Sequence, residues 1–217
     1  MALTLNGSTN TIAGVAVGGL PDGIVDTDML AANAVVTGKI TDGTIVSGDI
    51  NGGLPAAGLT EADCWIVDSD FSGGSGGLDV TANWIRANAG SGGNLSQKVG
   101  TGMSQSSGVW TFPSTGVWYV WFMSQAYDNQ SSTYMYGSII GSPNNMSSTE
   151  FLSSGASYLY RDSGNVYEGV QCSYLFDVID TSNYKVKFRV TGEQNMTWGG
   201  HADRMDTGAI FMRLGDT

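Results

Sequence analysis

The residues best suited to chemistry gather between Trp198 and Asp206, a stretch that holds the chain's single histidine, His201. Asp203 and Asp206 follow closely and supply carboxylates that could orient an imidazole base or share a metal ion with it. Catalysis also needs a nucleophile or a metal within reach, and this spacing matches no catalytic motif. We therefore expect a solvated turn or a recognition loop here and predict that the protein is not an enzyme.

A second group of carboxylates lies near the start of the chain, at Asp22, Asp26, Asp28, Asp42 and Asp49. Carboxylate oxygens in repeated loops can bind calcium. Asp-Gly pairs are first of all turn formers, however, so a solvated turn is the favoured interpretation. We predict no cofactor, and the sequence leaves the presence of a metal ion open.

Cys64 and Cys172 are the two cysteines of the chain. They are too few and too far apart in sequence for a disulfide scaffold or a zinc site, and no Cys-x-x-Cys pair supports redox chemistry. The favoured interpretation is two reduced thiols, buried as small apolar groups. A single bridge between two strands is the alternative.

The acidic N-terminal region is built from a ten-residue repeat, with copies at 22–31, 32–41 and 42–51. One copy cannot close a core, because a few aliphatic side chains at about 1.5–3 kcal/mol each do not offset the ordering of ten residues. Repetition of such units predicts an intertwined shaft. The expected contacts between its chains are the apolar fourth and ninth positions: Val25, Leu30, Val35, Ile40, Ile45 and Ile50.

Aromatic residues divide the chain in two, since residues 1–58 contain none. The stretch from Gly52 to Gly58 is rich in Gly, Ala and Pro and marks a linker. We predict an N-terminal docking segment at 1–20, a repeat shaft with its linker at 21–58, and a β-rich domain at 59–217. The charge-free docking segment is expected to be ordered only when bound to a partner or to its own copies.

The net charge of −11, with nine scattered Lys and Arg residues, excludes the basic footprint of a nucleic-acid-binding protein. The longest strongly apolar run, 117–123, is too short to cross a bilayer. The first residues do not form a classical secretion signal. We therefore expect no membrane insertion, and release by cell lysis or assembly into a particle.

From residue 59 onward the pattern is that of short β-strands separated by Gly, Ser and Asn, typical of a sandwich or jelly roll. Segments 170–178 and 184–190 alternate between apolar and polar residues, and we predict that they form a hairpin. Segment 117–123 is apolar on both faces. One face meets the core, so Val117, Tyr119 and Trp121 on the other predict an association surface. Further strands are predicted at 64–67, 80–86, 109–112, 133–140, 156–160 and 209–214.

The stretch from Ser107 to Phe122 reads Ser-Gly-Val-Trp-Thr-Phe-Pro-Ser-Thr-Gly-Val-Trp-Tyr-Val-Trp-Phe. It resembles the G-x-[FY]-T-x-P-x-x-G-x-Y-x-F motif of C1q and tumour-necrosis-factor-like (TNF-like) domains, with Trp118 where tyrosine is usual. Segments 184–191 and 207–214 resemble the family's last two strands. The resemblance covers 105–217, with 59–104 as the first strands. It implies an all-β jelly-roll sandwich that assembles as a homotrimer through Val117, Tyr119 and Trp121.

The decapeptides resemble the Asp-Gly-x-Ile/Val-x-Thr repeats in tail-fibre and related proteins of bacterial viruses, particularly marine ones, which often carry a C1q-like head. The combination implies a trimeric fibre with a thin shaft at 21–58 and a jelly-roll knob at 59–217. Residues 1–20 are then expected to dock to a tail, baseplate or capsid protein of the virion. Calcium on the trimer axis is left open.

The resemblance also places three turns, 127–132, 161–166 and 192–206, at the apex of the knob. Amides and carboxylates beside aromatic rings suit sugars, because amides satisfy hydroxyl groups and rings stack on apolar sugar faces. The same residue types also occur in ordinary loops. The candidate receptor-binding residues in these turns are Asp128, Asn129, Gln130, Arg161, Asp162, Asn165, Asn195, Trp198 and His201.

These patterns together predict a non-enzymatic virion fibre protein, assembled in the host cytoplasm and released by lysis, whose knob attaches to a glycan or protein of the host surface. A structural decoration protein of the capsid or baseplate is an alternative with the same architecture. A carbohydrate-active depolymerase and a free C1q-like binding module are further alternatives. The depolymerase would need paired carboxylates, which sequence spacing cannot identify.

Overall fold

The structure of the chain is a computed structural model that describes residues 4–6, 8, 11–13, 45, 58–87, 98–128, 131–160 and 164–217. The chain has two compact units, Met1–Pro55 and Ala56–Thr217. In the first unit, β1 (Thr4–Asn6) pairs with β2 (Thr11–Ala13) in antiparallel fashion. Of the predicted shaft contacts, Ile45 is described and exposed. The others lie outside the described residues: Val25, Leu30, Val35, Ile40 and Ile50.

The second unit is an all-β sandwich of two antiparallel sheets, which confirms this part of the predicted fold class. The first sheet, here the β10 sheet, contains eight strands among the described residues. In their order across the sheet they are β4 (Ser69–Gly73), β15 (Met196–His201), β10 (Gly116–Asp128), β16 (Thr207–Gly215), β3 (Ala62–Val67) and β6 (Trp84–Arg86), while β13 (Val166–Val178) also pairs with β10 and β7 (Lys98–Val99) with β3.

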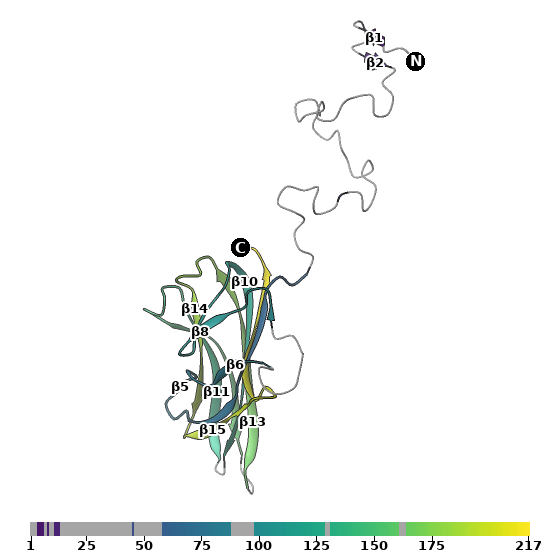
Figure 1. Ribbon diagram of the computed structural model, residues 1–217. Coiled ribbons are helices and arrows are strands. Elements are labelled where there is room, and N and C mark those ends of the chain that lie inside the picture. Colours follow the sequence, from purple (N-terminus) through teal and green to yellow (C-terminus); the bar gives the residue numbers. More distant parts are fainter. Residues whose placement is uncertain are drawn as a thin grey trace. The chain divides into compact units, whose positions relative to one another are not determined.

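The second sheet, here the β11 sheet, faces the first (Figure 1). The long strands β11 and β13 reach the end of the sandwich that lies away from the C-terminus (Figure 1). The described strands of this sheet are β12 (Glu150–Leu159), β11 (Ser132–Ser142), β14 (Lys185–Gly192), β9 (Val109–Thr111) and β8 (Ser104–Ser106), with β5 (Leu78–Asp79) paired to β14.

The core lies between the sheets and is rich in aromatic rings. Strand β10 turns Trp118, Val120 and Phe122 inward, and all three are fully buried. The ring of Phe122 stacks on Phe188 of β14, with centroids 4.7 Å apart and planes 11° from parallel. Because apolar residues alternate with a period of two, these strands present one continuous apolar face to the opposite sheet.

The predicted hairpin of segments 170–178 and 184–190 is wrong. The first segment is β13, which pairs with β10, and the second is β14, which pairs with β11 in the other sheet. Asp180 holds the connecting turn, since its carboxylate accepts hydrogen bonds from Ser182 N and Asn183 Nδ2. Alternation determines which side chains face the core, but it does not determine which strand lies alongside. The turn between the two segments was therefore wrongly interpreted as the turn of a hairpin.

Most other predicted strands are present, with two changes of bounds. The segment predicted at 80–86 is a strand only as β6, and the segment predicted at 156–160 is the end of the longer β12. Small residues fill the middle of β12, from Ser153 to Ser157, which weakened its signal in the sequence. No helix long and apolar enough to span a membrane occurs in the part of the chain that the structure describes.

Candidate interaction surfaces

The outward face of the β10 sheet carries two apolar rows that run across four strands. Residues directly opposite on neighbouring antiparallel strands share a face, so Tyr119 and Trp121 define rows on the side away from the core. The Tyr119 row is Leu175, Tyr119, Met212 and Ala62, and the Trp121 row is Ser173, Trp121, Ile210 and Cys64.

Neither row contains a charged side chain, and Tyr119 and Trp121 are each partly exposed while their chain neighbours are buried. Val117 lies on the same face, opposite Asp177. The prediction that these three residues point away from the core is therefore confirmed. A contiguous apolar face of this kind marks an association surface.

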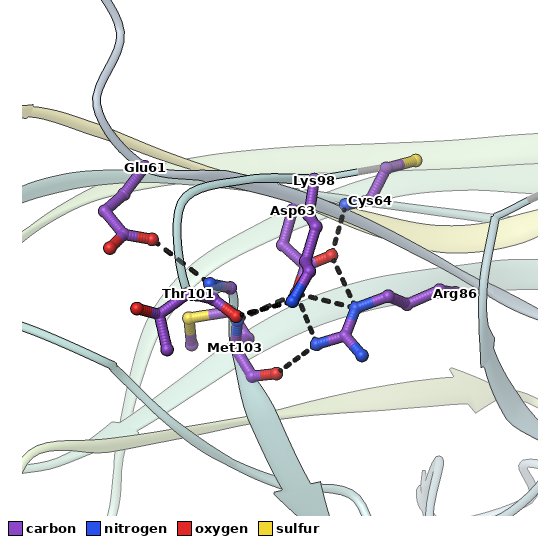
Figure 2. A network of polar contacts seen from close by, with 8 residues as sticks. Glu61, Asp63, Cys64, Arg86, Lys98, Thr101 and Met103 are labelled. Carbon is purple, nitrogen blue, oxygen red and sulfur yellow. Dashed lines mark hydrogen bonds and ion pairs between the residues drawn. The ribbon is translucent and has the colours of Figure 1, made fainter. Parts of the chain in front are cut away.

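A buried ion pair fixes the edge strand beside this face (Figure 2). The carboxylate of Asp63 is inaccessible and lies 3.1 Å from Nη2 of Arg86. It also accepts hydrogen bonds from the backbone N–H of Met103, at 2.7 Å, and of Cys64, at 3.1 Å. Arg86 in turn donates to the carbonyl oxygen of Met103 at 2.8 Å and stacks over the ring of Trp65 at 4.5 Å.

The Asp63 network holds residues 98–103 against the sheet. Strand β7 pairs with β3 at Ala62 and Asp63, and Gly102 N donates to the carboxylate of Glu61 (Figure 2). Gly102 has a φ of +76°, and a Cβ there would lie 2.7 Å from the Asp63 carboxylate. The close approach therefore requires glycine. Beside it opens a cavity of about 220 Å³ lined by Ala62, Asp63, Cys64, Lys98, Val99, Ile210 and Met212.

Both cysteines are free thiols. Cys64 belongs to the Trp121 row, whereas Cys172 points into the core from β13. Burial raises the pKa of each thiol to about 11, and the Asp63 charge adds to the effect at Cys64. Both therefore stay protonated and weakly reactive at neutral pH, as expected for small apolar groups in a fold without a bridge.

The candidate receptor-binding residues fall into three groups. Asn129, Gln130, Arg161 and Asp162 lie outside the described residues. Asp128, Asn165, Asn195 and His201 are partly or fully exposed. Asn195 accepts a hydrogen bond from Ser75 N, in the segment that follows β4, and His201 Nδ1 accepts one from Asp203 N within its own loop.

Trp198, the ninth candidate, has to be withdrawn. Its side chain is fully buried, and its Nε1 donates to the carbonyl oxygen of Gly73 at 3.0 Å. The segment predicted as a loop contains strand β15, whose alternation turns Met196 and Trp198 into the core. A ring without exposed surface cannot stack on a sugar. The period of two around this tryptophan was the signal that could have revealed its position.

The loop around His201 is built as a turn. Arg204 pairs with the carboxylate of Asp206, with Nε and Oδ1 2.8 Å apart. Asp203 contributes its backbone N–H to His201. Within the described ranges, no three His, Cys, Asp or Glu side chains are grouped so that they could hold a metal ion.

Sequence reasoning missed a group of exposed tyrosines on the outward face of the β11 sheet, here the tyrosine platform. Its members are Tyr134, Tyr136, Tyr158 and Tyr160. In the sequence this group is visible as two Tyr-x-Tyr pairs, in each of which an apolar residue separates the two tyrosines. Met135 and Leu159 are those intervening residues, and both are buried.

Comparison with solved structures supports the predicted jelly-roll fold. No protein-family model matches the sequence, and no curated protein matches it. Among solved structures, the chain is similar to Eiger TNF from S. frugiperda, with a TM-score of 0.53 and 12% identity over 72% of this chain and 93% of that one. It is also similar to murine APRIL at pH 5.0, with a TM-score of 0.48 and 12% identity over 71% and 98%. The second unit therefore has a TNF-like jelly-roll fold.

Proposed function

We propose that the chain is a non-enzymatic binding protein that assembles as a homotrimer through the outward face of the β10 sheet. The observation that carries the proposal is the pair of uncharged rows through Tyr119 and Trp121. Covering large apolar side chains stabilises an assembly by about 1.5–3 kcal/mol for each one fully buried. The resemblance to C1q and TNF-like domains supports three-fold closure, in which one surface of each copy meets a different surface of the next.

Two substitutions test this interface. Trp121→Asp places a charge in the centre of the rows, and we expect it to convert the trimer to monomers because an unpaired carboxylate is costly to bury. Phe151→Asp is the matched control, since Phe151 is an exposed aromatic residue on the other sheet. Native mass spectrometry of both full-length variants measures the assembly. A folded trimer of the Trp121 variant, or an equal loss in both variants, would count against the interface.

The finer form of the proposal is a virion fibre. Residues 1–20 dock to a tail, baseplate or capsid protein, residues 21–58 form the trimeric shaft, and the knob at 59–217 attaches to the host surface. The decapeptide repeats support this form, because each repeat is too small to bury its apolar positions alone. The protein is then a component of the virion, assembled in the host cytoplasm and released by lysis.

Purified virus particles test the fibre proposal. Mass spectrometry of the particles should detect the full chain. When a truncated chain that starts at residue 60 is produced in its place, the particles should lack it. Purified full-length protein should also compete with the particles for host cells. Absence of the chain from particles would overturn the fibre assignment, and presence without competition would replace host attachment by structural decoration.

A further inference from the structure

Four exposed tyrosines of the β11 sheet make up the tyrosine platform. Tyr134 and Tyr136 are each 38% exposed, Tyr158 is 66% exposed and Tyr160 is 74% exposed. Tyrosine presents a broad ring with only two side-chain torsions to fix, so a ligand that binds it loses little conformational entropy. Such a surface is costly to leave in water without a role.

The platform is held in place from below. Met135 and Leu159, which alternate with the tyrosines, are 0% and 2% exposed and anchor both strands in the core. The rings of Tyr134 and Tyr136 lie 5.6 Å apart at an angle of 39°. In the register, Tyr136 lies between Thr191 and Ala156, which both have short side chains.

The platform carries no charged side chain of its own, and its phenol hydroxyls provide polar groups at the edges of the rings. All four side chains are exposed, and a phenol hydroxyl can act as both donor and acceptor. The basic side chains one and two rows away, Arg189 and Lys187, are both paired with Asp79. The chain carries a net charge of −11. An anionic ligand therefore meets net repulsion, and neither of these two basic side chains is free to bind it.

We propose that the tyrosine platform binds a neutral saccharide, with rings stacked on the apolar faces of the sugar and phenol hydroxyls bonded to its hydroxyls. This inference rests on the proposed function in host attachment. It places the saccharide contact on the outward face of the β11 sheet and not at the buried Trp198. Along the chain, Tyr134 follows the predicted turn 127–132 and Tyr160 precedes the predicted turn 161–166.

A glycan array tests the platform, with neutral oligosaccharides beside sialylated and sulfated versions of the same chains at equal density. The full-length protein is compared with the double variant Tyr136→Ser/Tyr158→Ser and with Phe151→Ser. Phe151 is 63% exposed on the same sheet and lies at the other end of β12, which makes it a control for loss of an exposed ring. Far-ultraviolet circular dichroism confirms that each variant is folded.

We expect the wild type and the Phe151 variant to bind neutral oligosaccharides and the double variant to lose at least tenfold in signal while keeping its oligomeric state. Equal binding by the double variant, a preference for sialylated or sulfated chains, or no binding to any glycan would overturn the platform as a saccharide site. A change of oligomeric state in the double variant would instead show contact between copies and would also overturn it. Native mass spectrometry of the same samples separates the two proposals, because a monomer that binds glycans contradicts only the trimer.

Discussion

Trp121 of β10 and Ile210 of β16 lie directly opposite each other on the face of the sheet that points away from the core. Both are partly exposed. Cys64 continues the row on β3, and the next row is centred on Tyr119. An amphipathic strand in a monomer normally turns polar residues to this side, so the uncharged rows support the proposed interface.

The buried ion pair at the edge of this face is expected to matter for stability. Asp63→Ala removes the carboxylate that neutralises Arg86 and accepts from Met103 N. We expect the free energy of unfolding to fall by about 1–3 kcal/mol, because the buried N–H of Met103 loses its acceptor. Urea unfolding at one fixed protein concentration measures it, since the stability of an assembly depends on concentration.

Asp216→Ala is the matched control for the ion pair. Asp216 pairs with Arg213, but its side chain is 91% exposed. Exposed pairs contribute roughly 0–1 kcal/mol, so this variant should unfold almost as the wild type does. A loss of stability at Asp63 no larger than that at Asp216 would contradict a structural role for the network.

The packing between β12 and β13 predicts a difference between two glycines. A Cβ at Gly155 would lie 1.9 Å from the carbonyl oxygen of Gln171, whereas a Cβ at Gly169 meets nothing within 4 Å. Gly155→Ala should therefore lower the free energy of unfolding by about 1–3 kcal/mol through overpacking. Gly169→Ala should leave it nearly unchanged. Thermal or urea unfolding of both variants provides the check, and equal effects would mean that the two strands are not this close.

The two thiols predict a loss of stability at alkaline pH. Burial raises the pKa of Cys64 and Cys172 from 9.0 to about 11, so the folded state keeps protons that the unfolded chain releases near pH 9. Their contribution to stability is complete below pH 9 and is lost as the pH rises toward 11. The wild type should therefore lose more free energy of unfolding over this range than Cys64→Ala/Cys172→Ala. Parallel pH profiles would contradict the burial of the thiols.

Much of the fold could be predicted because a period of two is a local property of the chain. The inward residues Trp118, Val120 and Phe122 and the outward residues Tyr119 and Trp121 follow directly from alternation on β10. Pairing could not be predicted in the same way. Whether β13 lies beside β14 or beside β10 depends on contacts between residues distant in sequence, which no local pattern records.

The candidate site was harder to predict than the fold. Trp198 was chosen for its polar neighbours, yet it shares a face of β15 with Met196, and that face is buried in the core. Asp63 was not singled out, since its importance depends on Arg86 and Met103, which lie far along the chain. The tyrosine platform was visible only as two separate Tyr-x-Tyr pairs until strand pairing brought β11 and β12 together.

The oligomeric state of the full chain is the most direct test of the trimer interface. Sedimentation equilibrium of the wild-type protein at neutral pH, over a hundredfold range of concentration, gives its mass in solution. Assembly through the rows of Tyr119 and Trp121 predicts a single species of three times the 22.7 kDa of one chain. A stable 22.7 kDa monomer across that range would contradict the proposed interface and, with it, the trimeric fibre.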